Sequence, residues 1–472
     1  MILDHYSYKD FKDSFYDRIK NAEVFESGGI NFMKVVLECL VVRYALKGKI
    51  RQYIFYPFPG LFIATKRFFL TRNKTGKEKF LVFEKNYANK TYNSILVDSG
   101  RTLIDKNNNR ISFYYHNIRS FLESKGVSYL HYFEKHDKDV YDNDYSDHAY
   151  REFIKFSRLT TFDRDLLKQL RSLKKKIQAE NCFTEAELQN IYGGLTVFFE
   201  TARVWNYYLG KFKPEKIYLL GHYHREGIIY ASRKNNVKVI ELQHGLIAEE
   251  DIFYVLPKIY SPIKEKGLFA DKIYTYGNYW NSLLKKGFEY SPEQVKTLGY
   301  YLYEDANGSA IEEEKLKEFC NGHKVVLITT QPALHNDFCN YLNGWMSKLG
   351  NESKVRFILK LHPADTDAWY NDFASNPDVL VTRTRLEVLF KYSVIHLTSY
   401  STTLFDSMRY NVKNFSVNFP ASADYVKKIV EDGFSELLEV NEYPDLEKTA
   451  SQKTVVSYKD FFEAPNLELL LQ

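Results

Sequence analysis

Short apolar segments that resemble β-strands alternate with helical segments along this chain, and this alternation most constrains its fold. We predict strands at residues 79–83, 94–98, 127–133, 216–220, 237–242, 272–276 and 295–298, and a second series at 324–329, 355–361, 392–398 and 414–417. Strands that alternate with helices form parallel sheets with helices on both faces. The pattern therefore predicts α/β domains.

A polar, charged segment at 303–323 separates the two series of strands. The chain has 472 residues, more than one hydrophobic core normally organises, so two domains are expected. We assign residues 1–302 to an N-terminal Rossmann-like domain, 303–323 to a linker, and 324–472 to a C-terminal Rossmann-like domain that ends in a tail. Two doubly wound sheets of this kind would face each other across a central cleft.

A helical insertion is predicted in the N-terminal half, at about residues 160–210. Apolar residues recur there at helical spacing, first over 166–177 and again over 188–205. Thr184 and Glu187 have the spacing of a capping box, in which the two side chains accept hydrogen bonds from the first amides of a helix. Two long helices are therefore expected.

The composition excludes several classes of protein. Hydrophobic residues make up 44% of the chain and charged residues 26%, the balance of a globular rather than a disordered protein. The N-terminus lacks the pattern of a signal peptide, and no apolar stretch reaches the ~18 residues of a membrane-spanning helix. Four widely spaced cysteines show no metal-type pairing, which favours reduced thiols and a cytoplasmic protein.

One segment, 39–77, is basic, rich in aromatic residues and free of acidic side chains. Such a segment could lie against an anionic membrane surface, which would place the protein at the inner face of the cytoplasmic membrane. The alternative is a helix and loop whose apolar side joins the core and whose basic side is solvated. Binding to nucleic acid is not expected, because no nucleic-acid-binding motif accompanies the basic residues.

Polar residues follow the strands of the C-terminal series where each strand ends, which is where open α/β sheets bind ligands. A histidine-proline pair ends strand 355–361, and a hydroxyl cluster that ends strand 392–398 also begins a helix. A helix start with free N–H groups suits an anion such as a nucleotide phosphate, although the same residues could serve only as a turn and an N-cap. The predicted phosphate- or nucleotide-binding residues are Thr330, Gln331, His362, Pro363, Ser399, Ser401 and Thr402.

A second group of polar residues follows two strands of the N-terminal series, 216–220 and 237–242. The residues after each of these strands should project into the same cleft. His244, between Gln243 and Gly245, ends strand 237–242, and a neutral imidazole there could remove a proton from an attacking hydroxyl. Asp98 and Glu226 are rival candidates for this base, and each of the three could instead have a structural role. The other members of the group are His222, His224 and Arg225.

Three motifs in this order resemble those of bacterial capsule and surface-polysaccharide glycosyltransferases of the GT-B fold. They lie at 240–247, 360–363 and 397–406, so the resemblance covers roughly residues 215–418. Related patterns occur in sialyltransferases, Kdo-transferases and CDP-glycerol glycerophosphotransferases. The resemblance implies two Rossmann-like domains facing a central cleft, with the donor nucleotide bound by the C-terminal domain.

By that resemblance, His362, Ser401 and Thr402 would contact the donor phosphates. The acceptor would approach from the N-terminal domain, where His244 matches the position proposed for a base in the polyol-phosphate transferases. His222, His224, Arg225 and Gln243 would then lie on the acceptor side.

We expect a cytoplasmic, metal-independent, inverting glycosyltransferase. It would transfer a sugar from a nucleotide-activated donor, such as a CMP- or UDP-sugar, to a saccharide or lipid-linked acceptor in capsule or O-antigen synthesis, with no cofactor beyond that donor. The alternatives are a CDP-polyol phosphotransferase, a sugar-nucleotide 2-epimerase and a non-catalytic assembly scaffold. Asp-x-Asp patterns at 137–139, 142–144 and 365–367 resemble metal-holding motifs, but such matches are frequent in polar loops, and we predict no metal site.

Overall fold

The computed structural model of the chain describes residues 14–19, 21–46, 90–104, 109–134, 163–248, 251, 253–303, 310–349, 354–420, 422–449, 459 and 461–472. Three predicted features lie outside these residues in whole or in large part. They are the strand at 79–83, the Asp-x-Asp patterns at 137–139 and 142–144, and the part of the basic segment 39–77 that follows residue 46.

The N-terminal domain is built on a parallel sheet of six strands among the described residues, in the order β6-β3-β7-β8-β9-β10. Numbered along the chain this is 2-1-3-4-5-6, and the order reverses between β3 and β7. A doubly wound sheet binds ligands at the carboxyl ends of its strands beside such a reversal. The strands are β3 (Ser94–Asp98), β6 (Tyr129–Phe133), β7 (Lys216–Leu220), β8 (Lys238–Leu242), β9 (Lys272–Thr275) and β10 (Val295–Thr297).

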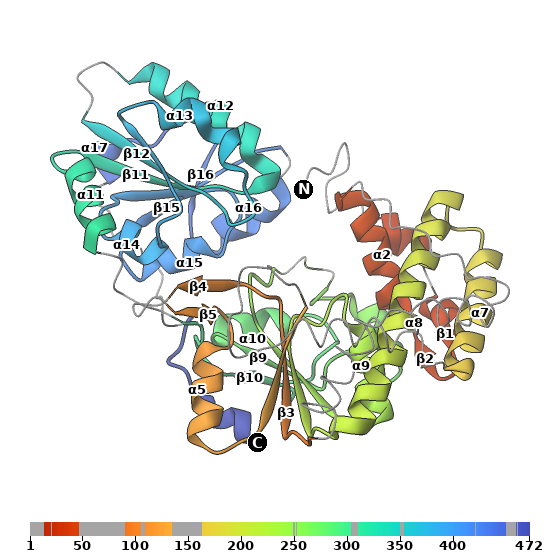
Figure 1. The fold of residues 1–472 in the computed structure, drawn as a ribbon. Helices are drawn as coiled ribbons and strands as arrows, with labels where there is room; N and C mark the ends of the chain where they lie inside the picture. Colours follow the sequence, from red (N-terminus) through yellow and green to blue (C-terminus); the bar gives the residue numbers. More distant parts are fainter. Residues whose placement is uncertain are drawn as a thin grey trace, which may run out of the picture.

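Helices cover this sheet, and a helical layer stands at the edge of the domain away from the other sheet (Figure 1). The predicted insertion at about 160–210 corresponds to two helices of that layer, α7 and α8, and the predicted capping box of Thr184 and Glu187 is confirmed. The helices are η1 (Ala22–Phe25), α2 (Met33–Leu46), α5 (His116–Ser124), α7 (Arg164–Ala179), α8 (Glu185–Phe212), α9 (Glu226–Lys234), η3 (Lys258–Ile263) and α10 (Asn278–Leu284). None of the described helices is both long and apolar enough to cross a membrane.

Two small antiparallel hairpins project from the N-terminal domain. One joins β1 (Glu26–Ser27) to β2 (Ile30–Asn31), and the other joins β4 (Thr102–Ile104) to β5 (Arg110–Ser112). The β4–β5 hairpin leaves the carboxyl end of β3 and lies on the side of the domain that faces the C-terminal sheet, next to α15 (Figure 1).

The C-terminal domain also contains a parallel six-stranded sheet, in the order β13-β12-β11-β14-β15-β16. Along the chain this is 3-2-1-4-5-6, the Rossmann order, which reverses between β11 and β14. The strands are β11 (Lys324–Thr329), β12 (Val355–Lys360), β13 (Val379–Thr382), β14 (Ile395–Thr398), β15 (Lys413–Val417) and β16 (Glu436–Leu438). The helices are α11 (Ala310–Cys320), η4 (Pro332–Leu334), α12 (His335–Lys348), η5 (Asp367–Tyr370), α13 (Asn371–Ala374), α14 (Leu386–Phe390), α15 (Thr403–Met408), α16 (Ala423–Glu431) and α17 (Leu446–Thr449).

These two sheets confirm the predicted fold class of two Rossmann-like domains facing a cleft, the GT-B arrangement, but two boundaries differ from the prediction. The segment 303–323, expected to be a linker, contains α11, which packs its buried Leu316 and Cys320 into the C-terminal core. The last residues, expected in the C-terminal domain, return to the N-terminal sheet. There the carbonyl of Leu470, in η7 (Leu467–Leu471), accepts hydrogen bonds from Tyr218 and Lys216.

An aromatic cluster joins the two domains where this tail crosses between them. Phe461 of the tail packs on Tyr279 of α10, Phe405 of α15 and Phe434, with ring centroids 4.6, 4.9 and 4.7 Å apart. Trp280 of α10 also packs on Phe405 and donates its indole N–H to the carbonyl of Phe461 at 2.9 Å. The relative position of the two sheets therefore depends on apolar packing.

Replacing Phe461 with alanine tests the contribution of this cluster to stability. Phe461 is buried, and deletion of a buried phenylalanine costs about 3–5 kcal/mol through lost burial and the cavity left behind. We expect Phe461→Ala to move the urea-unfolding midpoint markedly downward. Leu471→Ala is the control, because this side chain is 41% exposed. Equal midpoints for the two variants would contradict this role of the cluster.

Candidate functional site

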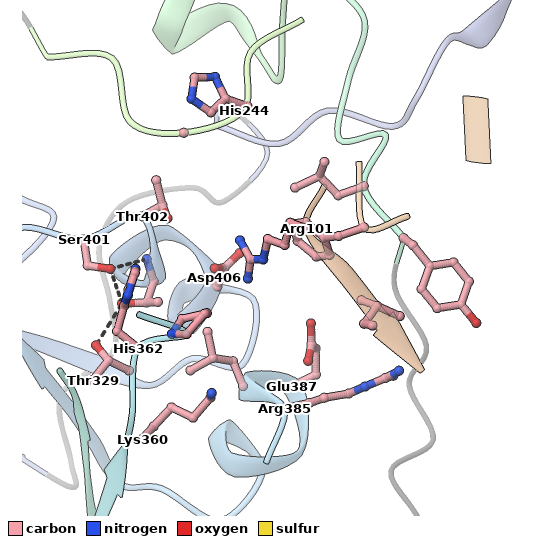
Figure 2. Close-up of a pocket in the computed structure, with 18 of the residues that line it drawn as sticks. Arg101, His244, Thr329, Lys360, His362, Arg385, Glu387, Ser401, Thr402 and Asp406 are labelled. Carbon is pink, nitrogen blue, oxygen red and sulfur yellow. Dashed lines mark hydrogen bonds between the residues drawn. The ribbon is translucent and has the colours of Figure 1, made fainter. Parts of the chain in front are cut away.

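A cavity of about 390 Å³ lies between the domains, at the carboxyl edges of both sheets. The C-terminal domain contributes residues that follow β11, β12, β13 and β14, and the N-terminal domain contributes residues that follow β3, β8, β9 and β10. Each sheet thus presents its ligand-binding edge to the same space. Polar residues on its walls include Arg101, His244, Thr329, Thr330, Lys360, His362, Arg383, Arg385, Glu387, Ser401, Thr402, Thr403 and Asp406 (Figure 2).

Positive charge gathers on the C-terminal wall of the cavity. Lys360, at the end of β12, has its pKa lowered to about 8 by burial and then by the charges of Arg101 and Arg383. Two carboxyl groups, Glu387 and Asp406, share the cavity. Burial, followed by the charge of Glu387, raises the pKa of Asp406 to about 7. The wall therefore favours an anionic ligand at neutral pH.

His362 lies where the sequence predicts it, on the cavity wall directly after β12. Its backbone N–H donates to Thr330 Oγ1 at 3.0 Å and to Asp365 Oδ2 at 2.9 Å, which holds the turn. The N–H of Ala364 donates to His362 Nδ1 at 3.1 Å, so in the neutral ring Nε2 carries the proton. Partial burial lowers the pKa of His362, which favours this neutral form. The ring can thus donate a hydrogen bond from Nε2.

A buried histidine supports the hydroxyl cluster at the start of α15 through a chain of hydrogen bonds. His396, in β14, is fully buried, and burial lowers its pKa to about 4. Its Nδ1 donates to Asn414, so Nε2 accepts from Thr329 Oγ1 at 2.9 Å. Thr329 Oγ1 also lies 3.0 Å from Thr403 Oγ1, which bonds Ser401 Oγ at 2.9 Å (Figure 2). This chain fixes the hydroxyls, including that of Ser401, at the start of α15.

The predicted donor-side residues divide into two groups. Thr330, His362, Pro363, Ser401 and Thr402 line the cavity.

Ser399 and Gln331 do not line the cavity. The Ser399 hydroxyl is buried and donates to the carbonyl of Val417 at 3.1 Å. The Gln331 amide donates to the carbonyl of Tyr400 and accepts from its N–H. Ser399 and Gln331 therefore stabilise the loop after β14 through hydrogen bonds to the backbone.

Asp365 and Asp367, the Asp-x-Asp pattern within the described residues, are both engaged by protein groups. Asp365 is buried and accepts from the hydroxyl of Thr330 and the N–H of His362. Asp367 forms an ion pair with Arg383, Nη2 to Oδ1 2.5 Å. Both carboxylates stabilise the turn that carries His362.

His244 faces the cavity from the N-terminal domain. Its Nε2 lies 2.8 Å from the hydroxyl of Tyr223, and Nδ1 is buried with no hydrogen-bond partner among the described residues. Gly221, with φ +80°, allows the His244 ring to pack closely against the backbone, because a Cβ at this position would lie 2.9 Å from His244 Cε1. Burial lowers the pKa of His244 to about 4. The imidazole that lines the cavity is therefore neutral near pH 7.

Gln243 holds the loop that presents His244 rather than facing the cavity. Its side chain is buried, donates to the carbonyl of Gly245 at 3.0 Å and accepts from the N–H of Tyr276 at 2.8 Å. The hydroxyl of Tyr301 donates to the Gln243 carbonyl at 2.8 Å. The strand-tip loop is thus tied to the ends of two neighbouring strands.

Asp98, a rival candidate for the base, is fully buried and does not line the cavity. Its Oδ1 accepts from the N–H of Gly100 at 2.8 Å, and its Oδ2 accepts from the Ser112 hydroxyl at 2.5 Å. His131 Nε2 lies 2.9 Å from the same Oδ2. Because Gly100 and Ser112 stand at the two ends of the β4–β5 hairpin, the structure places Asp98 as the anchor of that hairpin.

Glu226, the other rival base, also lies away from the interdomain cavity. It is buried beside Glu38, and burial and the neighbouring carboxylate raise its pKa well above the usual range. His224 and Arg225 line a separate cavity of about 210 Å³ next to α8. Arg225 is ion-paired with Glu134 and donates to three backbone carbonyls.

His222 is also removed from the cleft. It is fully buried, where it bonds Glu241 and donates Nε2–H to the carbonyl of Phe253 at 2.7 Å. Of the predicted acceptor-side and catalytic residues, the structure thus brings only His244 to the interdomain cavity.

Sequence reasoning missed several charged residues of the cavity. One group, Lys360, Arg383 and Arg385, follows strands β12 and β13 of the C-terminal sheet. Asp406 lies one turn into α15, and Arg101 follows β3. The rule that ligands meet the carboxyl ends of strands could have identified Lys360, at the second-last position of a predicted strand, and Arg101, three residues after another.

No family model matches the sequence, and no curated protein matches it. Solved structures with a similar fold include UDP-GlcNAc 2-epimerase from Methanocaldococcus jannaschii, at 12% identity and TM-score 0.46, over 80% of this chain and 98% of that one. The S. aureus MnaA-UDP co-structure has 12% identity and a TM-score of 0.43, over 76% of this chain and 85% of that one. The wall teichoic acid polymerase TagF has 14% identity and a TM-score of 0.45, over 87% of this chain and 94% of that one.

The lowered pKa of Lys360 predicts a pH-dependent affinity for anions. An anion that contacts the ammonium group stabilises its charged form, so binding above pH 8 requires uptake of a proton. We expect the affinity for UDP or CDP, measured by calorimetry, to fall between pH 7.5 and pH 9.5, by up to about tenfold per pH unit. Lys360→Arg should abolish this dependence, since arginine stays charged. An identical pH profile in both proteins would exclude Lys360 from the anion site.

Proposed function

We propose that this protein is a glycosyltransferase of the GT-B type. It would transfer a sugar from a nucleotide-activated donor to a hydroxyl of a saccharide or lipid-linked acceptor, in the synthesis of a bacterial surface polysaccharide. The observation that supports this most directly is the division of one cavity between two walls. The C-terminal wall is cationic and rich in hydroxyls, and the N-terminal wall carries the neutral imidazole of His244.

In the proposed reaction, the acceptor hydroxyl attacks the anomeric carbon of the donor sugar as the bond from that carbon to the phosphate oxygen breaks. The hydroxyl proton passes to the imidazole of His244, which lines the cavity and is neutral near pH 7. The hydroxyl becomes more acidic as its new bond forms, so a weakly basic imidazole suffices. Attack from the face opposite the leaving phosphate inverts the anomeric configuration.

The departing nucleotide gains negative charge, and the C-terminal wall is suited to stabilise it. Lys360 provides a positive charge, and the neutral ring of His362 donates from Nε2. The hydroxyl of Thr402 lines the cavity and makes no hydrogen bond to the described residues, so it is available to a phosphate oxygen. Groups fixed before the reaction stabilise developing charge without reorganisation.

A thermal-shift screen with CMP, CDP, UDP and GDP tests the donor class. A ligand present at 100 times its dissociation constant stabilises the native state by about 2.7 kcal/mol, enough for a clear rise in melting temperature. We expect one nucleotide to stabilise the protein and the Lys360→Met variant to lose this response. No response to any of the four would contradict the proposal and favour a scaffold.

Product analysis then distinguishes sugar transfer from polyol phosphotransfer and from epimerisation. We expect a glycoside and a released nucleotide only when an acceptor is present. A phosphodiester product with release of CMP from a CDP-linked donor would instead identify a polyol phosphotransferase. Conversion of a UDP-sugar without acceptor would identify an epimerase.

His244 and His362 can be separated by their effects on turnover and binding. Loss of a general base typically lowers the rate by about 10² to 10⁴. We therefore expect His244→Ala to lower kcat in that range while nucleotide affinity changes less than about twofold. His362→Ala should weaken both nucleotide affinity and turnover. Unchanged transfer by either variant, with native circular dichroism, would remove that residue from the mechanism.

A further inference from the structure

Arg101 is the cation that the N-terminal domain contributes to the described part of the cavity, whereas Lys360, Arg383 and Arg385 come from the C-terminal domain. In Figure 2 its guanidinium points from the hairpin side towards Asp406 and the C-terminal wall. It is close enough to that wall for its charge to lower the pKa of both Lys360 and His362.

The hairpin holds Arg101 in place through two contacts with Phe113, and Asp98 anchors the hairpin itself. The guanidinium lies over the ring of Phe113, with Cζ 4.1 Å from the ring centroid. The carbonyl of Arg101 accepts from the N–H of Phe113 at 3.0 Å, so the two residues are paired at the base of the hairpin. Asp98 ties both ends of the hairpin to the sheet through Gly100 and Ser112.

Within the described part of the chain, the charge of Arg101 has no direct partner. Among the residues that the structure describes, its guanidinium forms neither a hydrogen bond nor an ion pair, and the residue is exposed to the cavity. By contrast, Arg383 on the opposite wall is paired with Asp367. The β4–β5 hairpin therefore presents to the cavity an arginine whose guanidinium N–H groups have no partner among the described residues.

We propose that Arg101 binds the donor phosphate from across the cleft, so that the phosphate is held by both domains at once. The inference rests on the proposed function and extends it, because it assigns a donor-binding residue to the acceptor-side domain. A guanidinium suits this task, since its planar fork can donate two parallel hydrogen bonds to phosphate oxygens. Stacking on Phe113 restricts the side chain in advance, which lowers the entropy cost of binding.

The assignment also gives Asp98 a function different from the one expected from the sequence. Asp98 ends β3 as a catalytic carboxylate would, but its two oxygens are occupied by the hairpin. Within this proposal, Asp98 is a positioning residue that anchors the hairpin carrying Arg101.

The test compares nucleotide and nucleoside binding in four variants by titration calorimetry. The probes are CMP, CDP, UDP and GDP, and the corresponding nucleosides, which lack phosphate. Arg101→Ala should weaken binding of the best nucleotide by about 10- to 100-fold, as expected for loss of charge-assisted hydrogen bonds. Arg101→Lys should recover only part of this affinity, because a lysine keeps the charge but loses the fork. Binding of the nucleoside should be unchanged in both variants.

Arg171→Ala is the matched control. Arg171 is an exposed arginine of α7 in the same domain that does not line the cavity, so its removal should leave nucleotide affinity as in the wild type. Lys360→Met reports on the C-terminal wall. If Lys360→Met weakens nucleotide binding and Arg101→Ala does not, the role of Arg101 is wrong while the proposed function stands. If the wild-type protein binds none of the four nucleotides, both are overturned.

Discussion

Two parallel sheets turn the carboxyl ends of their strands towards one another, and the rest of the site depends on this arrangement. A parallel sheet delivers all its strand-end loops to one edge, beside which the strand order reverses. In this protein the reversals lie between β3 and β7 in one sheet and between β11 and β14 in the other. The aromatic packing of Phe461, Trp280 and Phe405 keeps the two edges facing the same cavity.

The two walls of the cavity present different chemical groups, because different buried side chains support them. On the C-terminal side, buried His396 and Asp365 align hydroxyls and the His362 turn, which leaves cations and donors facing inward. On the N-terminal side, Tyr223 and the Gln243 loop hold an uncharged imidazole. Under the proposed function, the C-terminal wall would stabilise the leaving phosphate, and the N-terminal wall would take the proton of the acceptor hydroxyl.

Much of the fold could be predicted from local pattern. Continuous apolar runs such as 216–220 and 324–329 are strands buried on both faces, and the Thr184 capping box marks the start of a long helix. The strand order could not be derived in this way, because it depends on contacts between distant segments. The return of the tail to the N-terminal sheet was missed for the same reason, since Leu470 meets Tyr218 from 252 residues away.

The site was predicted best where a residue directly ends a strand and its side chain points outward, as at His362 and His244. It was predicted poorly where distant residues occupy the side chain. Asp98 has the position expected of a catalytic base, yet Ser112 and His131 engage its carboxylate. Glu226 begins α9 and turns towards Glu38 of α2, a contact that no local pattern indicates.

The most direct test of the central claim is a crystal structure of the protein soaked with the nucleotide that stabilises it. Our account predicts that the phosphate lies in the interdomain cavity, within hydrogen-bonding distance of Lys360, His362 and the hydroxyls at the start of α15. A nucleotide bound elsewhere, or a cavity that stays empty at a saturating concentration, would contradict it.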